Sequence, residues 1–92
     1  SRDMNELDTL SNILRRSGDV PLETMLVVLL KYGKPRISHD GSGWHCALEM
    51  YVAAKGVDFK VASEFGNPTP SHAVKQCAER LATTVRDFGG PT

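Results

Sequence analysis

The spacing of the apolar residues changes along this chain from helical to alternating and back to helical, and this order constrains the fold more than any other feature. Apolar and polar residues alternate from Trp44 to Val52 and again from Val57 to Ser63, which is typical of strands with one packed face. On both sides of this region apolar residues recur at the helical interval. Because 92 residues are enough for one hydrophobic core, we expect a single α+β domain.

Two helices are expected before the strands. The first runs from Met4 to Arg16 and is amphipathic. Pro21 suits the first position of the second, because its missing N–H needs no partner there, and Gly33 ends that helix. Apolar residues such as Val27 and Leu30 widen its packed stripe, so we expect this helix to be the most buried of the domain.

The middle of the chain predicts three antiparallel strands, and its end predicts a third helix. A first strand from Arg36 to His39 joins the strand from Trp44 to Val52 through the turn-rich tetrapeptide Asp40 to Gly43, and a third strand follows from Val57 to Phe65. Ser71 is the expected cap of the last helix.

The resulting order beyond the first helix is α-β-β-β-α. A meander that buries one face under two helices makes a two-layer sandwich, to which the first helix is an addition. We therefore divide the chain into an N-terminal amphipathic helix and connector (1–20), an α-β-β-β-α domain (21–88) and a tail (89–92).

Three segments carry a resemblance to a known family: the Pro-initiated helix "PLETMLVVLLKYGKP", the meander "GWHCALEMYVAAKGVDFKVASEF" and the small-residue helix "SHAVKQCAERLATTV". In this order they resemble the double-stranded RNA-binding domain. The resemblance implies that the domain binds duplex RNA by its shape, through its first helix, the loop between its first two strands and the start of its last helix. Carried onto this chain, it implies the RNA-binding positions Glu23, Thr24, Arg36, Gly41, Ser42, Gly43, Ser71, His72 and Lys75.

The chain departs from the family where RNA affinity arises. The turn before Trp44 has no Gly-Pro-x-His pattern, and Lys75 replaces a Lys-Lys-x-Ala-Lys cluster. Phosphate contacts by cations carry most of the affinity for nucleic acid, and eleven basic side chains are balanced by eleven acidic ones here. Duplex RNA binding is therefore the alternative hypothesis, with low affinity and a steep salt dependence.

The favoured hypothesis is a non-catalytic module that makes protein contacts, by dimerisation or by docking a partner, within a larger protein that handles RNA. The expected third strand is an edge of the sheet, alternating and free of proline, which suits the addition of another strand. The first helix and the outer sheet face are further candidate surfaces. The candidate interface residues are Leu7, Leu10, Leu14, Tyr51, Val57, Phe59 and Val61.

No motif predicts an enzyme, a metal site, a cofactor or a small-molecule substrate. His39 and Asp40 have no nucleophile placed with them, and adjacent strand residues such as His45 and Cys46 point to opposite faces, so they cannot share one zinc ion. The longest apolar run is too short to span a bilayer, so no membrane contact is expected.

Two observations leave alternatives open. The two cysteines, Cys46 and Cys77, fall on apolar stripes, which favours buried free thiols and a nuclear or cytoplasmic setting. Five cations near the helix ends either form one basic patch or only complement the helix dipoles. They are Arg15, Arg16, Lys31, Lys34 and Arg36.

Overall fold

The computed structural model of the chain confirms the α+β class and the order of elements. It describes residues 6–16, 20–52, 56–63 and 66–88. The elements are α1 (Glu6–Arg16), α2 (Leu22–Leu30), β1 (Lys34–Asp40), β2 (Gly43–Val52), β3 (Val57–Ala62) and α3 (Pro70–Phe88). Met4 and the tail 89–92 lie outside the described residues.

The three strands form the predicted antiparallel meander in the order β1-β2-β3. Ile37 pairs with Cys46, and Leu48 pairs with Val61, so the apolar residues of all three strands share one face. Polar partners such as Lys60 and Glu49 share the other face. β1 begins two residues earlier than expected and includes Pro35, which a strand tolerates at the edge of a sheet.

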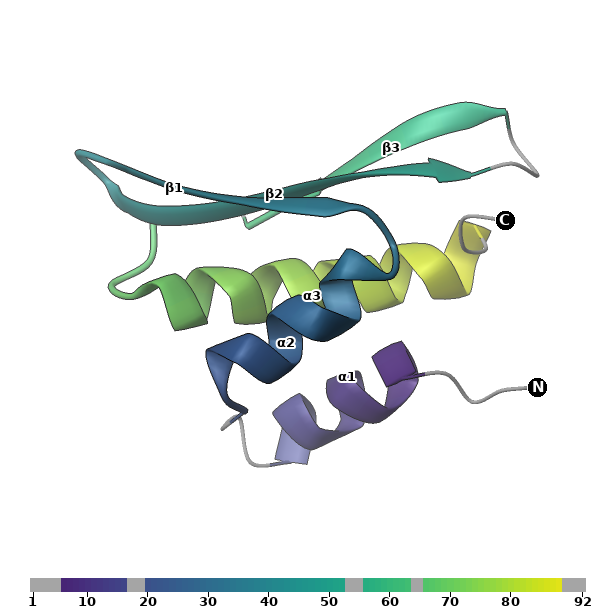
Figure 1. The fold of residues 1–92 in the computed structure, drawn as a ribbon, viewed down its shortest axis with the longest axis horizontal. Coiled ribbons are helices and arrows are strands. Elements are labelled where there is room, and N and C mark those ends of the chain that lie inside the picture. The colour runs from purple at the N-terminus through teal and green to yellow at the C-terminus, as the bar shows by residue number, and fades with distance from the viewer. Residues whose placement is uncertain (1–5, 17–19, 53–55, 64–65, 89–92) are drawn as a thin grey trace.

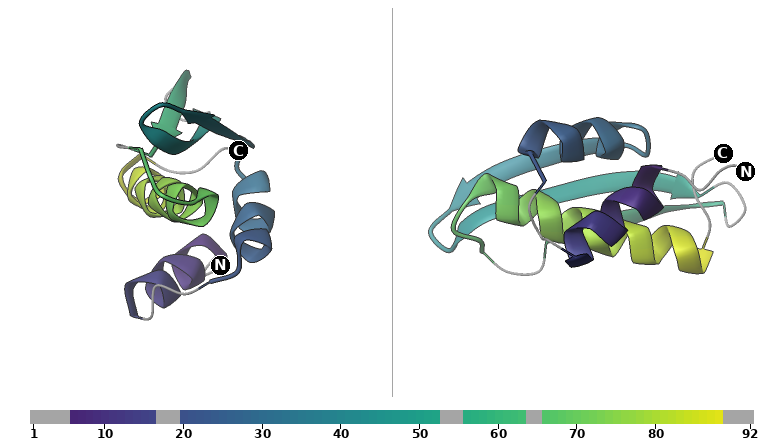
Figure 2. Two further views of the ribbon diagram at one scale, coloured as in Figure 1. Left: turned by 90° about the vertical axis from the view of Figure 1, so that its left-hand side faces the viewer. Right: turned by 90° about the horizontal axis from the view of Figure 1, so that it is seen from below.

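The helices lie on the apolar face of the sheet in two tiers (Figure 1). α2 and α3 lie side by side directly beneath the strands, and α1 packs against both of them on the side away from the sheet (Figure 2). The core is one continuous cluster that reaches from α1 to the sheet, with Leu10, Leu29, Leu48 and Leu81 all buried. α1 is therefore part of the same packed unit as the α-β-β-β-α segment.

Cys46 of β2 and Cys77 of α3 meet in this core as free thiols. A side-chain hydrogen bond with Cys46, together with burial, holds the pKa of the Cys77 thiol well above its usual range. A protonated, buried thiol is a poor nucleophile and a poor metal ligand. The expectation that the two cysteines pack across the sheet–helix interface is confirmed.

The starts of two helices differ from the sequence-based expectation. Pro21 precedes α2 with an extended ψ of 143°, so it is the capping residue and Leu22 is the first helical one. α3 is capped by Thr69 instead of Ser71, because the Thr69 hydroxyl accepts the backbone N–H of His72 at 3.2 Å. Pro70 then takes the first helical position, where its fixed φ is favourable.

The prediction that α2 is the most buried helix is wrong. Met25, Val28 and Leu29 are buried, but Val27 and Leu30 are 57% and 59% exposed. α2 lies at one side of the helical layer, so only the stripe facing α1, α3 and β1 is covered. Its outer face consequently presents apolar side chains to solvent.

The loop before α3 is clamped onto the hairpin of β1 and β2. The N–H of Trp44 donates to the carbonyl of Asn67 at 2.8 Å, and the N–H of Asn67 donates back to Trp44 at 3.0 Å. Gly43 has a φ of 131°, and a Cβ there would lie 2.7 Å from the Asn67 oxygen. Gly66 likewise leaves no room for a Cβ against the backbone oxygen of Ser42. These two glycines permit the close approach of loop and turn.

Candidate functional site

Three segments implied by the RNA-binding resemblance lie at the same end of the molecule. The β1–β2 turn and the starts of α2 and α3 gather at the left of Figure 1. The two helix starts line one hollow of about 290 Å³, to which Pro21, Ser71, His72 and Lys75 contribute. Glu23 and Thr24 follow in the first turn of α2 and are exposed. All the residues carried over from the family except Arg36 come from these segments.

Arg36 lies elsewhere, on the outer face of the sheet. Its β2 partner is Ala47, whose side chain points away from the helices, and Arg36 borders a hollow of about 360 Å³ with Lys34, Glu49 and Lys60. The structure does not bring Arg36 to the helix starts. α1 and α2 run in opposite directions, so their last turns lie at opposite sides of the molecule (Figure 1). The arginines that end α1 and the lysine that ends α2 therefore do not form one basic patch.

The β1–β2 turn holds a hydrogen-bonded group of Asp40, Ser42 and His45. The Asp40 carboxylate accepts the Ser42 hydroxyl at 2.7 Å and the Ser42 N–H at 2.8 Å, and it lies 3.1 Å from Nε2 of His45. The Ser42 bonds first, and His45 after them, hold the pKa of the Asp40 carboxyl well below its usual range. His39, which the sequence placed beside Asp40, instead contacts the Trp44 ring at 4.9 Å between centroids.

This group has the residue types of a Ser-His-Asp triad without its geometry. In a triad the carboxylate and the serine bond to different nitrogens of the imidazole. Here Ser42 Oγ, at 3.0 Å, and Asp40 both contact Nε2 of His45, and the serine hydroxyl is bonded to the carboxylate itself. The arrangement fixes a two-residue hairpin turn by an Asx-type contact and leaves no activated nucleophile.

The charges at this end do not favour a phosphate backbone. Asp40 and Glu23 are exposed, and among the described residues Lys75 is the only lysine or arginine that lines the hollow between the helix starts. Leu14 also lines this hollow, and exposed Arg15 and Arg16 follow it at the end of α1. The outer face of α2 continues from Glu23 to exposed Val27 and Leu30. A surface on which a few cations are mixed with carboxylates and apolar side chains gives less counterion release on contact with RNA than a cluster of cations does.

Four of the residues predicted for a protein interface are buried within the chain itself. Leu7, Leu10 and Leu14 of α1 pack under α2 and α3, and Val61 faces the core from the inner side of β3, which α3 covers. Their side chains are covered within the chain, the three leucines by α2 and α3 and Val61 by α3, so in the single chain they offer no exposed side chain to a partner. Phe59 is half-buried against the core. The side chains of Tyr51 and Val57 lie outside the described part of the structure.

The edge of β3 is the candidate surface that the backbone itself defines. The Ser63 N–H donates to the Cys46 carbonyl of β2 at 2.8 Å. Because residues of an antiparallel pair alternate between bonding the neighbour and facing away, the N–H and C=O groups of Asp58, Lys60 and Ala62 face the open side. No strand of the described residues pairs with this side.

The opposite edge of the sheet is formed by β1 and differs in one respect. The same alternation turns the backbone of Pro35, Ile37 and His39 away from β2. Pro35 has no N–H to offer there, which blunts this edge against further pairing. β3 contains no proline, so its edge keeps its donors.

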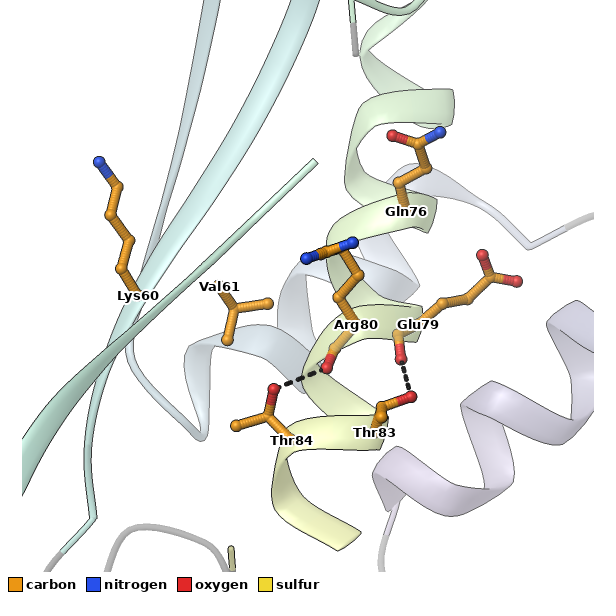
Figure 3. Close-up of a pocket in the computed structure, with 7 residues that line it drawn as sticks. All are labelled: Lys60, Val61, Gln76, Glu79, Arg80, Thr83 and Thr84. Atoms are coloured by element: carbon orange, nitrogen blue, oxygen red, sulfur yellow. Dashed lines mark hydrogen bonds between the residues drawn. The ribbon is translucent and has the colours of Figure 1, made fainter. Parts of the chain in front are cut away.

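A groove of about 460 Å³ runs between the β3 edge and α3 (Figure 3). Lys60 and Val61 form the strand side, and the α3 side is formed by Gln76, Glu79, Arg80, Thr83 and Thr84. The two threonine hydroxyls donate to the helix carbonyls of Glu79 and Arg80, at 3.3 and 2.9 Å. The sequence predicted that β3 is an edge strand. It did not predict which residues of α3 form the other wall of the groove, because that depends on how α3 packs against the sheet.

Comparisons of the chain with known protein families, with curated proteins and with solved structures found no match. Among the described residues, no group of three or more potential ligands is placed to hold a metal ion. No described helix is both long and apolar enough to cross a membrane.

Proposed function

We propose that this chain is a non-catalytic protein-interaction module with the layout of a double-stranded RNA-binding domain, and that it binds through the β3 edge. The observation that carries the proposal is the outward-facing backbone of Asp58, Lys60 and Ala62, which no described strand pairs, beside the groove on α3. An added strand would bond to these groups, and its alternate side chains would enter the groove. The larger parent protein that handles RNA remains part of the proposal through the family resemblance.

The surface charge supports protein contact over RNA contact. Eleven basic and eleven acidic side chains cancel. The end that resembles the RNA-binding surface mixes Glu23 and Asp40 with Lys75 and the two arginines that end α1, and apolar Val27 and Leu30 continue it along α2. Binding to a phosphate backbone requires clustered cations, so duplex RNA is the weaker candidate.

The proposal is tested by selecting peptides from a random display library against the whole 92-residue chain and comparing two proline variants. Lys60→Pro removes an N–H that faces the open side of β3. Ile37→Pro removes the equivalent outward N–H of β1 and is the matched control. We expect the dissociation constant of a selected peptide to rise at least about tenfold in Lys60→Pro and to change little in Ile37→Pro. Circular dichroism checks that both variants fold.

A selected peptide that binds Lys60→Pro as tightly as the unaltered chain would contradict the proposal. A parallel titration uses an RNA duplex of about 20 base pairs at low and moderate salt, with the Lys75→Ala variant beside it. Duplex binding that falls with salt and weakens in Lys75→Ala would favour the alternative function. Absence of duplex binding at low salt, with peptide binding retained, is the result we expect.

A further inference from the structure

We infer that the strand added to β3 is the β3 of a second copy of this chain, paired antiparallel about a twofold axis at Phe59. The inference rests on the proposed strand addition and names its partner. The supporting observation is the order of the charged residues along the open edge of β3. Asp58 and Lys60 are neighbours among the residues whose backbone faces outward, and they have opposite charge.

The alternation of the strand restricts the registers that a twofold axis allows. Outward-facing residues must meet outward-facing residues, so the axis passes through Asp58, through Phe59 or through Lys60 when the charged part of the strand pairs. An axis at Asp58 places two aspartates opposite each other, and an axis at Lys60 places two lysines opposite each other. Only the axis at Phe59 places Asp58 opposite the partner's Lys60, twice by symmetry.

The state of these side chains in the single chain fits this register. Both lie on the outer face of the sheet and are exposed. Neither forms an ion pair with any residue that the structure describes. On the inner face Phe59 is half-buried, and the axis places it against the partner's Phe59, which would complete the cover of the core at this edge.

The groove beside β3 accommodates the second copy. A continuous six-stranded sheet would keep both α3 helices on one face and bring their groove walls together across the axis. Each wall carries both signs of charge, Glu79 and Arg80, as a self-complementary surface requires. The Thr83 and Thr84 hydroxyls are bonded within their own helix, so this wall can be covered without stranding them.

Sedimentation equilibrium of the whole chain over a wide concentration range, with charge-reversed variants, tests the register. We expect the unaltered chain to dimerise reversibly. Asp58→Lys alone and Lys60→Asp alone each create like-charge pairs, and each should weaken dimerisation at least about tenfold. An equal mixture of the two variants restores both opposite-charge pairs, so it should form a heterodimer. The double variant with both changes in one chain should dimerise like the unaltered chain.

The outcomes separate this inference from the proposed function. A chain that stays monomeric throughout, or single variants that dimerise undiminished, would overturn self-pairing, as would a mixture that does not recover. If selected peptides still lose affinity in Lys60→Pro in that case, strand addition stands and the partner is a foreign peptide. Because Lys60 lies opposite Glu49 of β2, circular dichroism of each variant confirms that a loss of dimer is not a loss of fold.

Discussion

Asp40 shows how one side chain ties the β1–β2 turn together. Its carboxylate accepts both the N–H and the hydroxyl of Ser42 and contacts His45, and these partners favour the charged form. The sequence correctly indicated that turn chemistry explains Asp40, because Asp before Gly and Ser is typical of such turns. It could not identify His45 as the partner, since that contact depends on the register of two strands.

Asp40 makes the stability of the fold depend on pH in the acidic range. The pKa of its carboxyl is lower in the folded chain than in the unfolded one, where it is about 3.9. The stabilisation is therefore present above that value and is lost as the pH falls through the lower folded pKa. The melting temperature of the unaltered chain should exceed that of Asp40→Asn near neutral pH, and the difference should shrink below about pH 4. A difference that does not vary with pH would contradict the assignment.

Gly43 and Gly41 flank the same turn and should respond differently to a side chain. Gly43 has a φ of 131°, and its added Cβ would crowd the Asn67 backbone, whereas Gly41 has open space. We expect Gly43→Ala to lower the free energy of unfolding by about 1–3 kcal/mol, as strained backbone positions do. Gly41→Ala is the matched control and should change it little. Urea unfolding measures both, and equal effects would show that loop 66–69 does not clamp the turn.

At the scale of elements, periodicity predicted the six helices and strands that the structure describes. It failed to predict which apolar side chains are buried, because burial depends on how the elements pack. The pattern in α2 was apolar on more sides than its neighbours cover, so Val27 and Leu30 were expected inside and lie outside. The leucines of α1 have a clear stripe, but the sequence could not say whether α2 and α3 or a partner covers it. The start of α3 had a local signal in the sequence, a Thr followed by a Pro, which is typical of a capping residue and a first helical residue. The prediction of Ser71 as the cap did not take this pair into account.

α1 should behave as part of the core. Leu10 is buried beneath α2 and α3, so Leu10→Ala should lower the free energy of unfolding by about 2–5 kcal/mol through lost burial and a cavity. Asn12→Ala is on the exposed side of the same helix and should change it by no more than about 0.5 kcal/mol. Thermal or urea unfolding distinguishes the two. Equal, small effects would mean that α1 is a detachable extension.

At the scale of the whole molecule, the two edges of one sheet differ in what they offer. Along the open edge of β1, Pro35 has no N–H to donate. Along the open edge of β3, three residues keep both their N–H and C=O groups, and a groove lies beside them. The sequence predicted the β3 edge because strand order follows from a meander with short turns. It could not predict the groove or the place of Arg36, because both depend on how helices and strands meet in three dimensions.

The most direct test of binding at the β3 edge is amide hydrogen exchange followed by NMR, on the labelled chain at low concentration, with and without a bound partner strand. We expect new protection at alternate residues, namely the amides of Asp58, Lys60 and Ala62, with little change at the β1 edge. New protection confined to Thr24, Ser42 and His72 would contradict binding at the β3 edge. It would make the end formed by the β1–β2 turn and the helix starts the binding surface instead.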